Sequence, residues 1–353
     1  MRERVAGQIG YALSAAWPLL AFGSCLLALA VPAPARAAQD CEVRGRSSVV
    51  VSVKAKGAKG DGKTDDTAAI QAAITAVGGT GGTALVPKGT YMVDAESEKR
   101  LMLKSDMTLK LDDGATLKVI PNGAKHTAAL TISAVSNVTV IGGTLEGDRK
   151  EHKTKSGQWG MGIRIVEDAR DVTIANVTAT KMWGDGFYVS SASNVRFCAV
   201  TAEGNRRQGL TIVAADGVLV LDSVFKDTRG TRPNAGIDLE PNKPDHIITN
   251  VRIENSKFLD NAGAGIILNC KHGRISKVEV ARNVFRGNRP LLIANAPAEI
   301  TSDFCRNRQF TKQEQIAAGF NPYATPIEIV VLQSDCENIG MEARRGKSTK
   351  PKP

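Results

Sequence analysis

Acidic and basic residues gather beside glycines in the middle of the sequence. The segments that carry them read Trp-Gly-Asp-Gly-Phe-Tyr, Asn-Arg-Arg-Gln-Gly and Gly-Ile-Asp-Leu-Glu-Pro-Asn. Carboxyl groups mixed with cations and a phenol are the residue types that transfer protons next to a charged substrate. The predicted catalytic residues are Asp185, Tyr188, Arg206, Arg207, Asp238 and Glu240. The predicted substrate-binding residues are Asp148, His152, Trp159, Arg164, Trp183 and Asn242.

The chemistry that these residues suit best is β-elimination from a uronate. That reaction needs a base near C5, a group that neutralises the sugar carboxylate, and a proton donor for the leaving oxygen. The arginines can supply the positive charge, and Tyr188 or His152 can transfer protons. Asp185 or Asp238 can orient a base or hold a calcium ion, so calcium stays open as a cofactor and no other is indicated. C5-epimerisation begins with the same proton abstraction and remains an alternative.

These residues lie within a repeat. Six segments share a pattern of alternating apolar and polar residues, and they begin at Asn137, Asp171, Asn194, Gly217, Asn250 and Lys277. Their spacing, about 23 residues with occasional insertions, is typical of the turns of a solenoid, in which stacking creates the core. We therefore predict an all-β fold, a right-handed parallel β-helix with a short N-terminal capping helix.

A second strand in each repeat aligns on one glycine. The first and third residues after this glycine are apolar, so they should point inward. The second residues should point outward and stack about 4.8 Å apart; they are Arg164, Tyr188, Thr211, Asp238 and Ile267. The fourth residues should share that outward face, and they are Val166, Ser190, Val213, Glu240 and Asn269. Candidates for an asparagine ladder at the corners are Asn205, Asn242 and Asn261.

Hydrolysis is the second enzymatic alternative. An inverting glycosidase needs two carboxyl groups roughly 6.5–9.5 Å apart. Asp185 and Asp238 lie two repeats apart, or roughly 9.6 Å along the solenoid. Elimination ranks first because basic residues lie among the acids, which suits an anionic sugar. A third alternative is a solenoid that binds or helps to export a polysaccharide without catalysis.

The ends of the sequence predict export. Arg2 and Arg4, an apolar stretch over residues 11–31 and an Ala-Arg-Ala motif form the pattern of a secretory signal. The predicted organisation is a signal peptide at 1–37, a single β-helix domain at 38–340 with its cap at 50–80 and repeats from about 81 to 340, and a basic disordered tail at 341–353. The protein should be periplasmic or extracellular, without stable membrane insertion after signal cleavage.

Charge and cysteine content narrow the partners. Lysine and arginine outnumber aspartate and glutamate by 46 to 36, which favours a polyanionic partner. An acidic polysaccharide fits this charge, whereas export argues against nucleic acid. Export also permits disulfides, and Cys305 with Cys336 is the predicted pair. Cys198 and Cys270 lie in strand-like segments, so we expect them to be small buried apolar groups.

The segment VKAKGAKGDGKTDDTAAIQAAI, from Val53 to Ile74, closely resembles the N-terminal signature of the pectate-lyase-like β-helix superfamily. That superfamily includes rhamnogalacturonase-type and polygalacturonase-like proteins and alginate C5-epimerases. The resemblance extends in pattern over residues 50 to 295 and implies the fold. In physical terms, Asp65 or Asp66 can cap a short helix whose apolar side closes the end of the solenoid.

The same resemblance does not imply a particular reaction. Alginate epimerases carry an acidic-Pro-His cluster after their Gly-x-Gly-Phe motif, whereas here the Gly-Asp-Gly-Phe at 184–187 runs into Tyr-Val-Ser. The Asn-Thr-Asp, Asp-Asp, Gly-His-Gly and Arg-Ile-Lys elements of polygalacturonases are not intact in this sequence. The catalytic residues of neither group can therefore be transferred.

Overall fold

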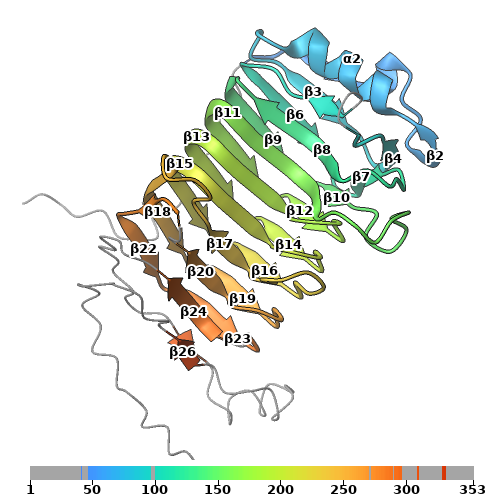
Figure 1. Cartoon of the computed structure of the whole chain (residues 1–353). Coiled ribbons are helices and arrows are strands. Elements are labelled where there is room, and N and C mark those ends of the chain that lie inside the picture. Colours follow the sequence, from blue (N-terminus) through green and yellow to red (C-terminus); the bar gives the residue numbers. More distant parts are fainter. Residues whose placement is uncertain are drawn as a thin grey trace, which may run out of the picture.

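The chain winds into a parallel β-helix made of two long sheets (Figure 1). The computed structural model describes residues 41, 47–96, 100–269 and 272–288 in full, and the backbone of 290–295, 308–309 and 328–330. The named strands pair in parallel with the strand of the preceding and of the following turn. The predicted all-β parallel β-helix is confirmed.

The first sheet, sheet A, contains β1 (Val50–Ser52), β3 (Thr83–Val86), β5 (Leu101–Met102), β6 (Met107–Leu111), β8 (His126–Ser133), β9 (Ser136–Ile141), β11 (Trp159–Ala175), β13 (Phe187–Cys198), β15 (Leu210–Leu221), β17 (Ile237–Leu239), β18 (Ile247–Glu254), β20 (Ile266–Asn269), β21 (Arg274–Ile275), β22 (Val278–Ala281), β24 (Pro290–Asn295) and β26 (Glu328–Val330). The second, sheet B, contains β2 (Asp61–Asp65), β4 (Gly89–Val93), β7 (Ala115–Val119), β10 (Thr144–Glu146), β12 (Thr178–Thr180), β14 (Thr201–Glu203), β16 (Val224–Lys226), β19 (Lys257–Leu259), β23 (Val284–Arg286) and β25 (Arg308–Gln309).

Sheet A itself bends into two faces. The first half of β11 pairs with β8 and its second half pairs with β9, and a register shift separates the halves. Face one consists of β8, the first parts of β11 (residues 159–166), β13 (187–190) and β15 (210–213), residues 237–240, and β20. Face two consists of β9, the second parts of β11 (residues 170–175), β13 (193–198) and β15 (216–221), and then β18 and β22. Sheet B is face three.

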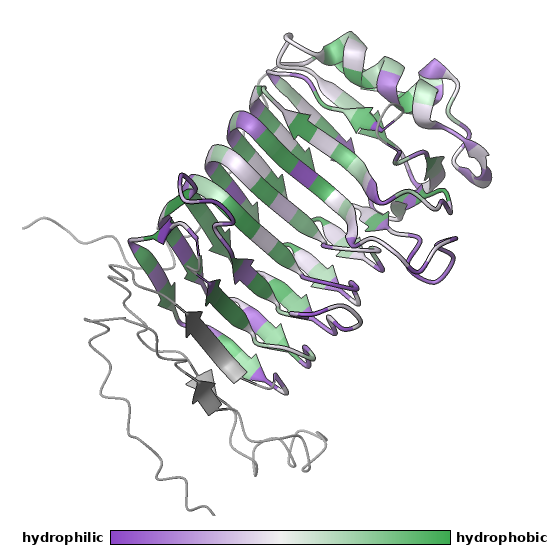
Figure 2. Cartoon of the chain, in the orientation of Figure 1, coloured by the Kyte–Doolittle hydropathy of each residue, from purple (hydrophilic) through white to green (hydrophobic). Residues whose placement is uncertain are grey.

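Apolar side chains from the three faces fill the interior. The predicted inward residues Ile163, Phe187, Leu210, Ile237 and Ile266 are all fully buried. Phe258 stacks between Phe225 and Phe285 with ring centroids 5.4 and 4.8 Å apart. Each such ring contributes roughly 1.5–3 kcal/mol of transfer free energy. Figure 2 shows hydrophobic and hydrophilic residues alternating along the strands, as this packing requires.

The predicted repeat starts form one corner of the solenoid. Asn137, Asp171, Asn194, Gly217, Asn250 and Lys277 all have positive φ. Asn, Asp and Gly tolerate this left-handed conformation best, so the corner explains why five of the six repeats begin with such residues, Lys277 being the exception.

A buried polar ladder runs along a different corner. The side chain of Asn261 accepts a hydrogen bond from the Thr228 N–H at 3.1 Å and donates to the Phe225 carbonyl at 3.0 Å. Asn205 makes equivalent bonds to the backbone of its own neighbours. The prediction for Asn242 is wrong, because this residue is exposed in the loop after residue 240 and takes no part in the ladder. Insertions displaced it from the corner.

Helix α2 (Thr67–Val77) covers the N-terminal end of the solenoid (Figure 1), after the short 3-10 helix η1 (Val53–Lys56). The two adjacent aspartates, Asp65 and Asp66, accept hydrogen bonds from different backbone segments. The Asp65 carboxylate accepts the Thr67 N–H at 3.0 Å at the start of the helix. The Asp66 carboxylate instead accepts the N–H groups of Lys59 and Gly60, at 2.6 and 2.9 Å, and so closes the preceding turn.

One expectation about the cysteines is wrong. Cys198 is buried as predicted, but it forms a disulfide with Cys41, and their Cα atoms are 5.8 Å apart. The partner lies 157 residues away in the sequence, beyond the reach of any local pattern. Cys270 and the predicted Cys305–Cys336 pair lie outside the described residues, as do the predicted signal and tail. Among the described residues, no helix is long and apolar enough to cross a bilayer.

Candidate active site

The outward residues of face one form the predicted column. Strand pairing aligns Arg164 with Tyr188, Tyr188 with Thr211, and Thr211 with Asp238, and the last in the column is Ile267. The next predicted column is wrong at one place, because Ser190 pairs with Ala214 rather than Val213. A register irregularity inserts one residue into β15 there, as a β-bulge does.

Arg207 joins two carboxylates across this column. Its guanidinium lies 3.1 Å from the Asp185 carboxylate and 2.7 Å from that of Glu240. The Thr211 hydroxyl also donates to Asp185, at 2.9 Å. Arg207 comes from the corner before β15, so its side chain reaches over the strands of three turns. Thr211 and Asp238 are buried even though they point away from the core.

Asp238 has a separate and incomplete set of partners. Its Oδ2 accepts a hydrogen bond from the Gln208 side chain at 2.5 Å, and Gln208 in turn accepts the Ala235 N–H at 2.9 Å. The other oxygen, Oδ1, is buried without a hydrogen-bond partner among the described residues. An unpaired buried oxygen disfavours the ionised carboxylate.

Burial dominates the protonation of the two aspartates. Burial raises the pKa of Asp185 to about 6, although Arg207 and Thr211 oppose the rise. Burial, followed by repulsion from Glu240, raises the pKa of Asp238 well above its ordinary value. Burial alone would lower the pKa of Arg207, but Asp185 and Glu240 outweigh it and raise that pKa. Arg207 is therefore a fixed cation and a poor base.

Tyr188 lies at the centre of these charges. Burial raises the pKa of its phenol, a hydrogen bond with Ser190 lowers it, and Asp185 and Glu240 raise it further. The net rise keeps the phenol protonated at neutral pH. Such a group is suited to donate a proton.

Arg164 lies next to Tyr188 on the other side, and Arg100 lies close to Arg164. Burial lowers the pKa of Arg100, and the nearby charge of Arg164 lowers it further, while Glu167 raises it. No ion pair within 4 Å is found for either arginine among the residues that the structure describes. Two neighbouring guanidinium groups repel each other, so an anion placed between them would be stabilised. Sequence reasoning missed Arg100, because the short strand β5 that follows it shows no repeat phrase.

The predicted residues near the long loop before β11 form a second cluster. The ring of His152 is buried against Trp183, with centroids 4.1 Å apart, and its Nδ1 lies 2.8 Å from the Asp148 carboxylate. Arg206 stacks on the same indole at 3.8 Å and donates to the Gly157 carbonyl. In this arrangement these four side chains hold the corner beside Asp185.

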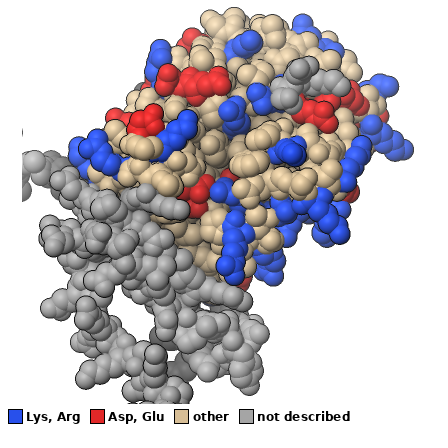
Figure 3. Space-filling model, in the orientation of Figure 1, with Lys and Arg blue, Asp and Glu red and all other residues tan. Residues whose placement is uncertain are grey.

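Trp159 and Asn242 are predicted residues for which no hydrogen bond or ring contact with either cluster is found among the described residues. Trp159 is 39% exposed and stacks flat on His126, with centroids 4.6 Å apart. A flat, open aromatic surface suits stacking against a sugar ring. Figure 3 shows Lys and Arg side chains spread over this face of the molecule, with Asp and Glu side chains among them. Within the described part of the chain, no three His, Cys, Asp or Glu side chains are grouped to hold a metal ion.

Fold and site together define a parallel β-helix protein with an ionisable cluster on one outer face. The chain belongs to the family described as rhamnogalacturonase A/epimerase, pectate lyase-like, which matches residues 50–281. Among its relatives, YclG of Bacillus subtilis (strain 168) is 30% identical over an alignment of 286 residues, and the match covers 67% of this chain and 48% of that protein. Mannuronan C5-epimerase AlgE4 of Azotobacter vinelandii is 35% identical over 189 residues, covering 50% of this chain and 33% of the epimerase. The chain thus spans about half the length of YclG and a third of AlgE4.

Solved structures show the same fold. The family 28 exopolygalacturonase of Yersinia enterocolitica superposes with a TM-score of 0.60 at 17% identity, covering 74% of this chain and 59% of that one. PfbA, a surface adhesin of Streptococcus pneumoniae, superposes with a TM-score of 0.56 at 20% identity, covering 74% and 78%. At these identities the likeness concerns the fold alone.

Proposed function

We propose that the protein is a polysaccharide lyase that cleaves an acidic, uronate-containing polysaccharide by β-elimination on face one. The observation that carries this proposal is the position of Tyr188 between unlike charges. Arg164 lies next to it on one side, with Arg100 close to Arg164 and neither arginine in an ion pair within 4 Å among the described residues, and Asp185 and Glu240 lie on the other. A uronate needs a cation, a base and a proton donor in this proximity.

Each group has one role in the proposed reaction. Arg164 and Arg100 bind the sugar carboxylate and so make the C5 proton more acidic. Glu240, the more exposed of the carboxylates that act on Tyr188, accepts that proton as the C5–H bond breaks. The electrons of this bond form the C4–C5 double bond while the C4–O bond breaks. Tyr188 donates its proton to the leaving oxygen.

The relatives support an acidic sugar as substrate. AlgE4 is named as a mannuronan C5-epimerase, and inversion at C5 of a uronate can begin with abstraction of the C5 proton. Elimination shares this opening step, so a common site can serve either outcome. Epimerisation therefore remains the alternative that differs only in where the proton returns.

Hydrolysis is the second candidate, and one observation favours it. The raised pKa of Asp238 keeps a carboxylic acid protonated close to the Glu240 carboxylate. An acid and a carboxylate on one face are the two groups that a glycosidase needs. This pair would protonate the glycosidic oxygen and activate a water molecule, with no need for Arg164.

The product distinguishes these reactions. We expect ultraviolet-absorbing unsaturated ends to accumulate when the mature protein is incubated with mannuronan or polygalacturonate, with and without calcium. Tyr188→Phe should lower the rate roughly 10²- to 10⁴-fold, the usual contribution of a general acid, and Arg164→Gln should also lower it. Arg170→Gln is the matched control, because Arg170 is exposed on the same strand but on face two.

Other products would contradict the lyase proposal in defined ways. New reducing ends without ultraviolet absorbance would indicate hydrolysis, and the Asp238→Asn variant should then be inactive. Exchange of the C5 proton with solvent deuterium without chain cleavage would indicate epimerisation. Binding without any of these changes would indicate a non-catalytic polysaccharide-binding protein.

We further propose that the protein is exported to the periplasm or beyond the cell. The basic, apolar and small-residue pattern at 1–37 and the Cys41–Cys198 disulfide support this proposal, because disulfides persist in oxidising compartments. Mass spectrometry of the protein from fractionated cells should find a chain without residues 1–37 and with Cys41 bonded to Cys198. Full-length protein with free thiols in the cytoplasm would contradict export.

A further inference from the structure

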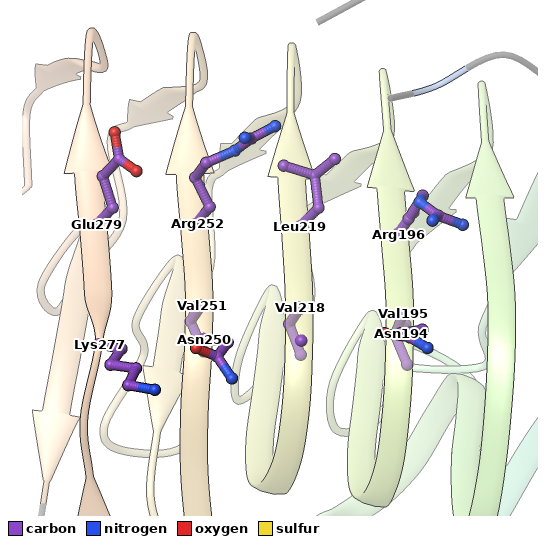
Figure 4. A pocket seen from close by; sticks show the side chains of 11 residues that line it. Asn194, Val195, Arg196, Val218, Leu219, Asn250, Val251, Arg252, Lys277 and Glu279 are labelled. Carbon is purple, nitrogen blue, oxygen red and sulfur yellow. The ribbon is translucent and has the colours of Figure 1, made fainter. Parts of the chain in front are cut away.

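Face two carries a hollow that the proposed reaction does not use. Its volume is about 410 Å³, and it extends over four successive turns of the solenoid (Figure 4). One side is the strand column Arg196, Leu219, Arg252 and Glu279. The other side is the corner column of repeat starts, which includes Asn194, Asn250 and Lys277. Arg207 and its partners lie on face one, around the bend of the same strands.

The charge of this hollow is predominantly positive. Arg196 and Lys277 are exposed, and neither forms an ion pair within the part of the chain that the structure describes. Arg252 pairs with Glu254, which lies outside the lining. Glu279 is the one carboxylate among the lining residues, and it lies at the end of the strand column (Figure 4). An acidic ligand would therefore meet cations over most of the length.

The spacing of the cations follows from the repeat. The tripeptide Asn-Val-Arg occurs at 194–196 and again at 250–252, with one turn between them. Two strand spacings separate the two arginines, roughly 10 Å along the solenoid. This is about the length of a disaccharide. Leu219 lies between the arginines (Figure 4) and offers an apolar surface for the face of a sugar ring.

We infer that the hollow on face two is a second binding site for an acidic polysaccharide, with the chain running along the solenoid axis. Carboxylates on alternate sugars would contact Arg196 and Arg252. The side-chain oxygens of Asn194 and Asn250, whose amide groups donate to Asp171 and Asp216, would accept hydrogen bonds from sugar hydroxyl groups. The acidic class of the ligand is shared with the proposed function, but the site needs no catalysis. Its role is to hold the polymer on the side of the enzyme.

Titration calorimetry with mannuronan and with polygalacturonate at low salt tests this inference. The variant Arg196→Gln/Lys277→Gln should bind roughly three- to tenfold more weakly, since each exposed pair contributes little. The difference should shrink as salt is added. The control Lys59→Gln/Lys63→Gln removes the same charge from exposed positions near the N-terminal cap. Arg164→Gln reports binding on face one separately.

The outcomes are distinct. Weaker binding by the face-two variant alone, with the control at wild-type affinity, supports the inference. Equal losses in both double variants would overturn it in favour of a non-specific charge effect. Unchanged affinity, or a wild-type protein that binds neither acidic polymer or binds a neutral glucan equally well, would also overturn it. Turnover plays no part in the measurement, so a failure of the lyase proposal would be seen in the product assay and not here.

Discussion

Faces one and two share the same three long strands, but the outward side chains of the two faces differ in burial. On face one, Thr211 and Asp238 point away from the core and are nevertheless fully buried. On face two, the outward Arg196 is exposed, and Leu219 beside it is half-buried. The strands therefore set the spacing of side chains on both faces but not their burial.

The corner segments account for the difference. Arg207 extends from the turn before β15 and covers face one, where it connects carboxylates from separate turns. No such side chain crosses the hollow on face two among the described residues. In a repetitive fold, electrostatic specialisation thus arises where one corner departs from the repeat. The segment Asn-Arg-Arg-Gln-Gly is such a departure.

Removal of Arg207 should have the largest effect on the stability of face one. Arg207→Ala leaves Asp185 and Glu240 without their shared cation in a buried site. The expected loss is about 3–5 kcal/mol in the free energy of unfolding, the usual cost of breaking one side of a buried ion pair. Urea denaturation measures it. Loss of activity in this variant would not by itself identify a catalytic role.

The matching change on face two should have almost no effect on stability. Arg196→Ala removes an exposed side chain that has no ion pair among the described residues, so the free energy of unfolding should change by less than about 0.5 kcal/mol. If the two alanine variants were destabilised equally, burial under the corner would not distinguish the two faces.

The sequence predicted the backbone arrangement well for a physical reason. Alignment on one glycine per turn gave both the inward residues, such as Phe187, and the outward column from Arg164 to Asp238. Period-two alternation and one glycine are enough to fix register, because a slip by one residue would expose the core face. The bulge at Val213 escaped this alignment, since it adds a residue that is as apolar as its neighbours.

Contacts made by long side chains were beyond the same reasoning. The pattern placed Arg207 near the site, but not its bridge between Asp185 and Glu240, because the reach of a guanidinium is not encoded in spacing. The sequence made His152 a candidate for substrate binding and proton transfer, but not its stacking on Trp183 or its contact with Asp148. The bond between Cys41 and Cys198 joins segments that no repeat relates.

The protonation of Asp185 should make the stability of face one depend on pH. The folded protein holds the pKa of Asp185 at about 6, above the ordinary 3.8. Between these values the unfolded chain loses the proton first and binds fewer protons than the folded chain, so stability must fall as pH rises from about 4 to 6. The full loss above this window is roughly 3 kcal/mol, and Asp238 acts in the same direction.

Asp185→Asn isolates this contribution, because an amide cannot ionise. The variant can keep the hydrogen bond from Thr211, and its stability should fall less than that of the wild type as pH rises through this window. Urea unfolding midpoints at several pH values between 4 and 7 measure the two slopes. Parallel profiles would mean that burial does not raise the pKa of Asp185 in solution. Burial raises the pKa of Asp185 against the opposing charge of Arg207, so the stability of face one should be more sensitive than that of face two to a rise in pH through this window.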